Sequence, residues 1–361
     1  MEKADKIVKI NKLSGGRIVR WIVWTNMFSK IRSRIVPDIG IDLGSTNTRV
    51  CVVGRGVVLE IPSVLAINMK TDQVVEVGEK AKDYLGRRAG DVIVVGPLKN
   101  GRIVDASITA AFLWHCIEKT CPRHWWRKFL KPRVEITVQS GVTEVEEFAM
   151  ESAARVAGAG EVFLLESPMA AAVGAGLSVA EPSGCMIVEI GGSSCSAVMI
   201  ADAAVVADRV CPGGDVFDLC IFDHLRTTYN MEIDAATAES VKKTIGSVCP
   251  FESEQDMEVA GTDIASGGPR KVMVTSEEIR KALAGQVSLI VECVREVIHE
   301  AGPKYAKVIM DRGIVLSGGG SLLRGLDELL AKEIGLKVVR VEAPASCAID
   351  GVGMVLKELN R

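Results

Sequence analysis

Two matching hairpins dominate the pattern of apolar and polar residues along the chain. Residues 38–53 read as an apolar strand, a turn of Gly, Ser and Thr, and a second apolar strand, and residues 186–200 repeat this order. Each first strand carries one carboxylate near its end, Asp42 in the first hairpin and Glu189 in the second. Turns of small residues let backbone N–H groups approach phosphate oxygens closely. The repeated pattern therefore predicts a duplicated domain with one nucleotide between its halves.

Alternating and helical periodicities predict the other elements and an α/β fold. The predicted strands cover residues 56–67, as a pair bent at Pro62, and residues 74–78, 92–95, 134–138 and 161–165. The predicted helices cover residues 79–89, 108–119, 143–158, 169–174, 217–230, 237–246 and 276–300. A capping box of Thr143 and Glu146 is expected at the start of the third helix. From residue 313 a strand runs into a triple-glycine turn and a helix.

The first 36 residues combine basic charge with an apolar stripe. Residues 1–15 read as a basic arm, whereas residues 17–35 read as an amphipathic helix that Pro37 stops. Basic helices with aromatic residues lie in membrane surfaces; packing of the stripe on the protein's own core is the alternative. Met27 is an alternative translation start. The stripe consists of Trp21, Trp24, Phe28, Ile31 and Ile35.

A second basic and aromatic segment covers residues 122–133. It holds five Lys or Arg residues, no acid and four large apolar side chains. This composition predicts membrane insertion or binding in a partner's groove, and folding of the side chains back onto the domain is the alternative. The apolar residues are Trp125, Trp126, Phe129 and Leu130.

The amino-acid composition limits the class of protein and its location in the cell. The chain has 361 residues, 48% hydrophobic and 25% charged, as expected for a globular protein of about two domains. The net charge is −3, yet residues 1–36 carry nine Lys or Arg against two acids, so an anionic surface is their expected partner. No apolar run reaches the ~18 residues of a membrane-spanning helix. We therefore expect a cytoplasmic protein that attaches peripherally to the inner face of the cytoplasmic membrane.

The ten cysteines include no C-x-x-C pair, and several lie in apolar runs, so they read as reduced core residues. Zinc is not expected, because the spacing of His115, Cys116, Cys121 and His124 is poor for that metal. The chain also lacks a Walker A string and a well-formed G-x-G-x-x-G, which argues against P-loop and Rossmann sites.

Four motifs occur in a recognisable order: Ile41-Asp42-Leu43-Gly44-Ser45, Glu189-Ile190-Gly191-Gly192, Glu239-Ser240-Val241-Lys242 and Leu316-Ser317-Gly318-Gly319-Gly320. Together they resemble the nucleotide signature of the actin-like ATPase fold, and most of all the MreB family of bacterial actins. The resemblance runs from about residue 28 to residue 356. It implies two lobes of RNase H-like topology, each with a smaller inserted subdomain. The implied subdomains are IA (37–65, 99–180 and 348–361), IB (66–98), IIA (181–215 and 280–347) and IIB (216–279), after the arm and helix of residues 1–36.

The resemblance also implies a site for ATP and Mg²⁺. Asp42 and Glu189 would act near the metal through bound water, and the two small-residue turns would hold phosphates. Glu239 would then contact the ribose and Lys242 the adenine. The remaining implied nucleotide-binding residues are Gly44, Ser45, Thr46 and Asn47, then Gly191, Gly192, Ser193 and Ser194, then Gly213, Gly214 and Asp215, and finally Gly318, Gly319 and Gly320.

Three departures from the family pattern bear on catalysis. Glu189 stands where the family has Asp, and Ser193 and Ser194 replace Gly and Thr. The family's Glu-Glu-Pro, whose second carboxylate orients the attacking water, is Glu166-Ser167-Pro168 here. Loss of a positioned general base costs about 10²–10⁴-fold in rate, so we expect nucleotide binding with slow or absent turnover.

The implied function is a filament-forming shape protein. The resemblance implies head-to-tail polymerisation into antiparallel double filaments on the membrane, contacts with membrane proteins of cell-wall elongation, a role in rod shape, and no nucleic-acid partner. A regulatory paralogue that joins filaments without hydrolysing ATP is the alternative. A small-molecule kinase of the same fold would need a catalytic Asp and a substrate pocket, and a chaperone ATPase would need a peptide-binding domain, none of which the sequence indicates.

Overall fold

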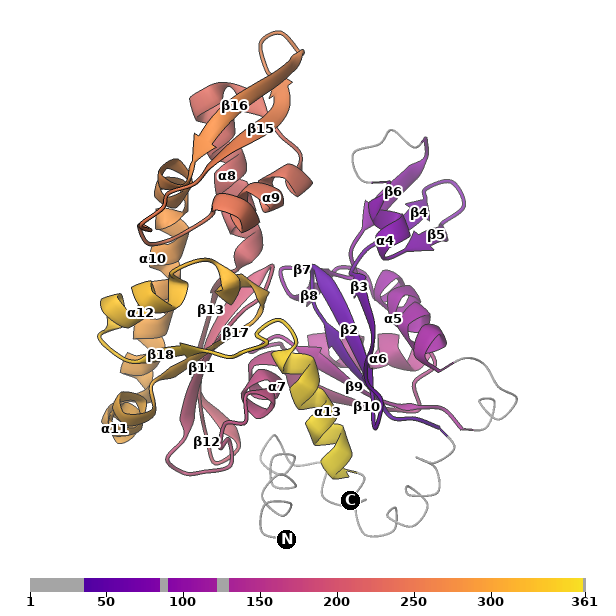
Figure 1. Ribbon diagram of the computed structural model, residues 1–361. Coiled ribbons are helices and arrows are strands. Elements are labelled where there is room, and N and C mark those ends of the chain that lie inside the picture. The colour runs from indigo at the N-terminus through magenta and orange to yellow at the C-terminus, as the bar shows by residue number, and fades with distance from the viewer. Residues whose placement is uncertain (1–35, 85–89, 122–129, 360–361) are drawn as a thin grey trace. The chain divides into compact units, whose positions relative to one another are not determined.

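The computed structural model describes residues 36–84, 90–121 and 130–359. The chain divides into two compact units, whose elements are labelled in Figure 1. Unit 1 consists of Met1–Ile187, Val198–Asp208 and Ala345–Arg361, and unit 2 consists of Val188–Ala197 and Arg209–Pro344. The predicted N-terminal helix lies outside the described residues.

A five-stranded sheet in the order β10-β9-β1-β2-β3 forms the centre of unit 1. Strands β1 and β2 form the first predicted hairpin, and β1, β9 and β10 run parallel to one another. The strands are β1 (Ile39–Leu43), β2 (Asn47–Val52), β3 (Gly56–Pro62), β9 (Arg133–Val138) and β10 (Glu161–Glu166). The helices are α5 (Ala106–Thr120), α6 (Glu144–Val156), α7 (Ser167–Gly174) and α13 (Cys347–Leu359).

Two small sheets complete unit 1. One has the order β5-β4-β6 and packs against the short helix α4, and the other is the β7-β8 ribbon. Their elements are β4 (Leu65–Asn68), β5 (Gln73–Val77), α4 (Glu79–Lys82), β6 (Val92–Val95), β7 (Leu98–Lys99) and β8 (Arg102–Ile103).

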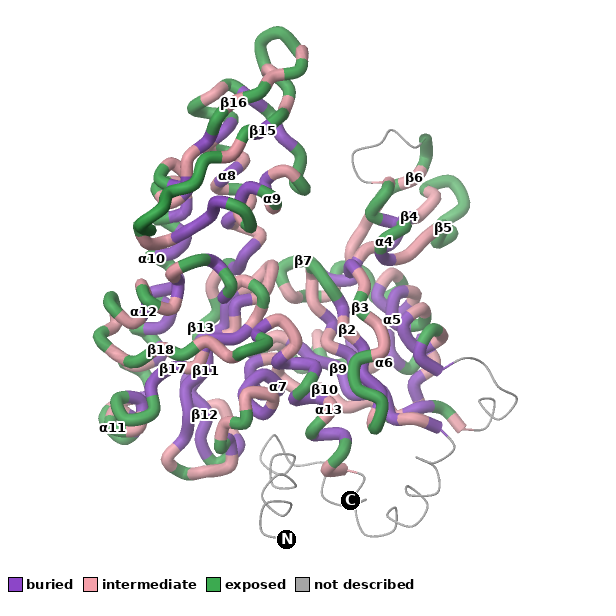
Figure 2. Tube along the Cα trace, viewed as in Figure 1, coloured by how far each residue is buried: buried purple, intermediate pink, exposed green. Residues whose placement is uncertain are grey.

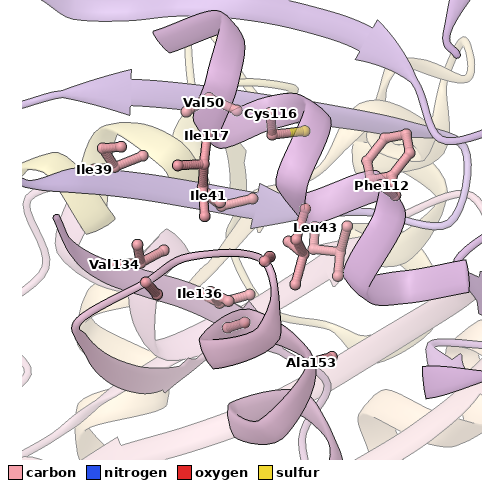
Figure 3. Close-up of a cluster of buried hydrophobic side chains, with 14 of the residues drawn as sticks. Ile39, Ile41, Leu43, Val50, Phe112, Cys116, Ile117, Val134, Ile136 and Ala153 are labelled. Atoms are coloured by element: carbon pink, nitrogen blue, oxygen red, sulfur yellow. The ribbon is translucent and has the colours of Figure 1, made fainter. Parts of the chain in front are cut away.

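The two faces of the central sheet carry different side chains, because successive residues of a strand point to opposite faces. Ile39, Ile41 and Leu43 of β1 join the apolar cluster of α5 and α6, which Figure 3 shows and which appears as buried positions in Figure 2. On the other face, a Cβ at Gly40 would lie 2.5 Å from the Val352 side chain, so only Gly lets α13 approach β1 this closely. Asp42 follows Gly40 on the same face as α13.

The second five-stranded sheet has the order β13-β12-β11-β17-β18 and contains the second predicted hairpin, β11 and β12. A three-stranded sheet, β14-β15-β16, belongs to unit 2. The strands are β11 (Cys185–Ile190), β12 (Ser194–Ala201), β13 (Ala204–Pro212), β14 (Met231–Glu232), β15 (Asp256–Asp263), β16 (Pro269–Thr275), β17 (Ile314–Ser317) and β18 (Val338–Arg340). The helices are α8 (Gly214–Tyr229), α9 (Ala235–Ile245), α10 (Ser276–Ala301), α11 (Pro303–Arg312), the 3-10 turn η2 (Gly319–Leu322) and α12 (Leu326–Ile334).

Local sequence signals located most of these elements, and the errors have physical causes. The capping box of Thr143 and Glu146 is confirmed. The helix expected over 79–89 is wrong at residues 83 and 84, because α4 ends at Lys82 and buries only Ala81, too little packing for a longer helix. Helix α7 begins at Ser167 rather than Met169, since Pro168 suits the first turn of a helix. None of the described helices is both long enough and apolar enough to cross a membrane.

Glu135 is a buried carboxyl group on the α13 face of the central sheet. It lies opposite Gly40 in the parallel β1-β9 pair and is 3% exposed. Burial raises its pKa to about 8, although the Arg133 charge opposes this shift. Among the described residues, its Oε2 atom has no hydrogen-bond partner. Glu135 therefore holds a proton in the folded chain at pH values where the unfolded chain releases it.

We predict that Glu135→Gln stabilises unit 1 increasingly as the pH rises. Because the folded pKa of about 8 exceeds the ordinary 4.5, the wild type loses stability between these two values, and the neutral amide removes that loss. The gain in unfolding free energy should be near zero at low pH and should approach about 5 kcal/mol above the folded pKa. Urea denaturation across this range measures it, with Glu252→Gln in an exposed loop as the control. A gain that is independent of pH contradicts the assignment.

Candidate functional site

Asp42 is held in place by a neighbouring strand of unit 1. Thr137 of β9 donates its hydroxyl hydrogen to Asp42 Oδ1 at 2.9 Å, and the Thr137 hydroxyl oxygen accepts the Leu43 N–H at 3.2 Å. Arg49 lies opposite Asp42 in β2. Burial raises the pKa of Asp42, while the Thr137 hydrogen bond and the Arg49 charge lower it. A half-buried carboxylate of this kind gains from a nearby cation, as the predicted metal role requires.

The first small-residue turn, Gly44 to Asn47, is fixed through its carbonyl groups. The buried Ser63 donates its hydroxyl to the Gly44 carbonyl at 2.5 Å and its N–H to the Thr46 carbonyl at 2.9 Å. A Cβ at Gly44 would clash with the Asn47 carbonyl oxygen, so the turn requires Gly there. The Gly101 N–H donates to Ser45 Oγ at 3.4 Å, and Thr46 and Asn47 are exposed.

The second small-residue turn, Gly191 to Ser194, is fixed in the same way by the start of α8. The carbonyls of Gly191, Gly192 and Ser193 accept the N–H groups of Gly214 at 3.0 Å, Asp215 at 2.7 Å and Gly213 at 3.1 Å, respectively. In a trans peptide the N–H points away from the carbonyl of the preceding residue. The Gly192 and Ser193 N–H groups therefore point away from α8, as donors to an anion would.

The triple glycine packs against the strand that carries Glu189. Gly318 has φ of 80° and a Cβ there would clash with the Ile190 carbonyl, so only Gly fits this turn. A Cβ at Gly214 would lie 4.0 Å from the Cα of Gly320, which places the triple glycine beside the start of α8. A Cβ at Gly319, in contrast, meets nothing within 4 Å and faces open space. Half-buried Glu189 thus belongs to the same part of unit 2 as these two turns.

Lys242 connects α9 to the start of α8. Its ammonium group donates to Asp218 Oδ2 at 2.7 Å and to the Gly214 carbonyl at 3.2 Å. Burial raises the pKa of Asp218, whose Oδ1 atom has no hydrogen-bond partner among the described residues. Glu239 pairs with Lys243 on the surface of α9 at 2.7 Å. The residues predicted to contact the ribose and the adenine therefore lie on one helix, which Lys242 links through Gly214 to the second small-residue turn.

Glu166 and Ser167 lie at the junction of β10 and α7. Leu165 is in register with Thr137, so Glu166, in register with Val138, points to the face opposite Asp42. Glu166 accepts the Ser140 hydroxyl at 3.4 Å. Burial and the nearby Asp208 raise its pKa, and the Ser140 hydrogen bond opposes this. The register therefore places Glu166 on the sheet face opposite Asp42, and Ser167 is the first residue of α7.

The donor set suits a hydrated magnesium ion. Mg²⁺ keeps most of its water and takes one or two carboxylates, rather than a cage of protein ligands. In the described parts of the chain there is no cluster of three or more metal-ligating side chains. Asp42 stands beside the first small-residue turn in unit 1 and Glu189 beside the second small-residue turn in unit 2, and each would by itself offer the single carboxylate that a hydrated Mg²⁺ accepts.

Of the predicted membrane residues, only Leu130 is described. It is half-buried and packs against the core of unit 1, so for this residue the alternative of folding back agrees with the structure. The other predicted membrane residues lie outside the described ranges: Trp21, Trp24, Phe28, Ile31, Trp125, Trp126 and Phe129.

Four supporting residues escaped the sequence analysis. Two of them had a visible signal: Thr137 follows Glu135 at the polar positions of an alternating strand, and Asp218 lies one helical turn after Asp215. Ser63 and Ser140 act through partners distant in sequence, Gly44 and Glu166, and no local pattern marks them.

Comparison with known proteins agrees with this geometry. The sequence profile of the MreB/Mbl protein family matches residues 36–361. The chain is 40% identical to the cell shape-determining protein MreB of Escherichia coli K12, over 92% of this chain and 97% of that protein. It is 39% identical to the cell shape-determining protein Mbl of Bacillus cereus, over 90% of this chain and 97% of the relative.

Solved structures give the same result. The crystal structure of MreB5 of Spiroplasma citri bound to AMPPNP matches with a TM-score of 0.84 and 34% identity, over 89% of this chain and 96% of that one. The same protein bound to ADP also matches with a TM-score of 0.84 and 34% identity, over 90% of this chain and 97% of that one. The MamK double helical filament matches with a TM-score of 0.74 at 16% identity, over 89% of this chain and 98% of that one, which shows likeness of fold alone.

Proposed function

Because the chain belongs to the MreB/Mbl family of cell-shape proteins and has an actin-like ATPase fold, we propose that it binds ATP with Mg²⁺ and polymerises. Its subunits join head-to-tail into filaments, and two filaments pair in antiparallel orientation on the inner face of the cytoplasmic membrane. There they organise cell-wall elongation with its membrane proteins and determine rod shape. The second phosphate turn carries this proposal, since its three carbonyls are occupied by α8 and its N–H groups point away. A solved relative bound to AMPPNP and ADP supports it.

We predict that Gly319→Arg weakens ATP binding by about 100-fold without unfolding the protein. The fold should tolerate the side chain, because a Cβ at Gly319 meets nothing within 4 Å, yet the arginine would fill the space beside the nucleotide turns. Gly285→Arg is the matched control, since Gly285 is exposed on α10 and its Cβ position is equally open. Equilibrium titration with ATP and Mg²⁺ measures the affinity. Equal binding by both variants, with Asp42→Ala also unchanged, would show that the site is misplaced.

Helix α6 offers a surface for self-association. Val145, Phe148 and Val156 are 77%, 71% and 78% exposed, and their spacing places them on one face of the helix. Exposed apolar side chains gathered on one face mark interaction sites more often than scattered ones do. A second copy of the chain is the proposed partner of this face, because the proposed filament is paired.

We predict that Val145→Glu raises the protein concentration needed for paired filaments by about 10-fold or more. Pairing through this face would remove water from the new carboxylate without giving it a partner. Leu289→Glu on α10 of unit 2, where the leucine is 50% exposed, serves as the control and should assemble normally. Sedimentation with ATP and electron microscopy provide the measurements. Paired filaments of Val145→Glu at the wild-type concentration would exclude α6 from the interface.

Membrane attachment is proposed from composition. The basic helix at residues 17–35 and the segment at 122–133 each supply aromatic residues and positive charge. A buried aromatic side chain contributes about 1.5–3 kcal/mol, so each element alone binds weakly and the two together bind firmly.

Flotation with anionic liposomes tests the attachment. We predict that a variant lacking residues 1–36 and carrying Trp126→Ser and Phe129→Ser remains at the bottom of the gradient and does not rise with the liposomes. Trp114→Ser is the control, because Trp114 is 44% exposed on α5, outside both elements, and this variant should float like wild type. If the truncated variant with both substitutions floats as well, the two elements are not the anchor.

The hydrolysis step is where this chain is proposed to differ from its relatives. Ser167, the first residue of α7, has a short and neutral side chain, and Glu166 points to the sheet face opposite Asp42. A general base must reach the attacking water within about 2.6–3.2 Å, and a short neutral serine or a carboxylate on the opposite sheet face is poorly suited to that role. We therefore favour slow turnover with retained binding, which also keeps the non-hydrolysing regulatory paralogue as the second candidate function.

We predict that Ser167→Glu raises phosphate release from polymerised protein by about 100-fold, because it restores a carboxylate at the family's position. Ser140→Glu serves as a control: it adds a carboxylate beside Glu166 on the opposite sheet face and should leave turnover low. A wild-type rate that matches hydrolysing relatives, and that the substitution at Ser167 does not raise, contradicts this interpretation.

A further inference from the structure

A row of polar side chains crosses four neighbouring strands of the central sheet of unit 1, β9, β1, β2 and β3 (Figure 1). Thr137 of β9 is hydrogen-bonded to Asp42 of β1. Asp42 lies directly opposite Arg49 of β2, and Arg49 lies directly opposite Glu60 of β3. Directly opposed residues of antiparallel strands share one face of a sheet. These four residues form the polar row.

The residue before Arg49 shows which face the arginine uses. Thr48 is fully buried and lies opposite Leu43, which belongs to the apolar cluster of α5 and α6. Successive residues of a strand point to opposite faces. Arg49 therefore points away from this cluster, to the face that carries Asp42.

Arg49 lies between two carboxylates. Its Nη2 atom donates to Glu60 Oε1 at 2.7 Å, and its side chain is 16% exposed, against 55% for Glu60. The Cβ atoms of directly opposed residues lie about 4.5–5.5 Å apart, so the charge of the long arginine side chain also acts on Asp42. One cation is thus shared between the carboxylate predicted to act near the metal and a carboxylate at the surface.

The polar row borders the first small-residue turn. Asp42 lies two residues before Gly44, and Arg49 lies two residues after Asn47. The row therefore lies at the base of the turn, where the chain enters and leaves it. A guanidinium group at this place adds a full positive charge beside backbone N–H groups, which carry only partial charges.

We propose that Arg49 shares with Mg²⁺ the neutralisation of the nucleotide's phosphates, so that the chain still binds ATP when the metal is removed. A planar guanidinium group carries several N–H donors that match phosphate oxygens, and the bond to Glu60 uses one of them. The same charge weakens the attraction of Asp42 for a second cation, because the two cations repel each other. Both effects lower the dependence of binding on Mg²⁺. This inference rests on the proposed function, in which the first turn holds phosphates.

A purely structural role for the row is the alternative, since cross-strand pairs of opposite charge stabilise sheets. Removal of Arg49 would then lower the stability of unit 1 and would change ATP binding by the same factor with and without Mg²⁺. Under the proposal, the two affinities change by different factors. The ratio of the affinities with and without the metal therefore separates the two roles.

Equilibrium titration of the full chain with ATP, once with Mg²⁺ and once with excess EDTA, measures this ratio. Arg49→Leu should weaken metal-free binding by about 10-fold or more, because one hydrogen bond between charged groups is lost. With Mg²⁺ the loss should be about 3-fold or less, because Asp42 without its arginine attracts the metal more strongly. Arg49→Lys keeps the positive charge and should retain most of the metal-free binding.

Arg270→Leu is the matched control. Arg270 is also a strand arginine paired with a carboxylate, Asp263 at 2.6 Å, but it lies on β16 in the three-stranded sheet of unit 2. Both affinities of this variant should equal those of wild type. Urea denaturation shows whether each variant is folded, and Arg49→Gln, which keeps a polar side chain without charge, takes the place of Arg49→Leu if leucine unfolds the sheet.

Three results would contradict the inference. If the substitution of Arg49 changes the two affinities by the same factor, or changes neither, the role of Arg49 is wrong, while ATP binding by wild type upholds the proposed function. The same holds if wild type binds ATP with Mg²⁺ but not in EDTA. If wild type binds ATP in neither condition, the proposed function fails and the inference fails with it.

Discussion

The structure of the candidate site depends on backbone carbonyl groups in its two turns that already accept hydrogen bonds from elsewhere in the same unit. In unit 1, Ser63 binds the carbonyls of Gly44 and Thr46, and in unit 2 the start of α8 binds those of Gly191, Gly192 and Ser193. Planar trans peptides then direct N–H groups the other way. Both turns thus expose backbone N–H donors without using a cationic side chain. If one of these carbonyls lost its hydrogen bond, the turn would be less stable.

A second constraint is the strict alternation of side chains along the strands of unit 1. Asp42 and Thr137 share one face of the sheet with Gly40, where α13 packs, while Glu166 follows Val138 to the face of α5 and α6. A shift by one residue would exchange these faces. For this reason Glu166 does not replace the carboxylate that is missing at Ser167, although the two residues are adjacent in sequence.

The two hairpins could be predicted from sequence because a strand, a tight turn and a strand are specified by neighbouring residues. Helix α6 was predicted for the same reason, with its capping box. Helix α13 and strand β18 were missed, because two glycines, Gly351 and Gly353, lower the helix propensity of α13, and β18 has only three residues. The roles of Ser63 and Thr137 depend on contacts between distant segments, which no local pattern reveals.

Under the proposed function, the departures from the family's sequence pattern would affect turnover more than binding, for a physical reason. Contacts made by backbone N–H groups are insensitive to side chains, so Ser193 and Ser194 can replace Gly and Thr as long as α8 still holds their carbonyls. A general base acts through one side chain at one distance, and Ser167 cannot supply it. Substitutions in the turns would therefore leave the donors intact, whereas the substitution at the start of α7 would remove the group proposed to act as the general base. Retained binding and lost turnover are the expected result of where each replaced residue acts.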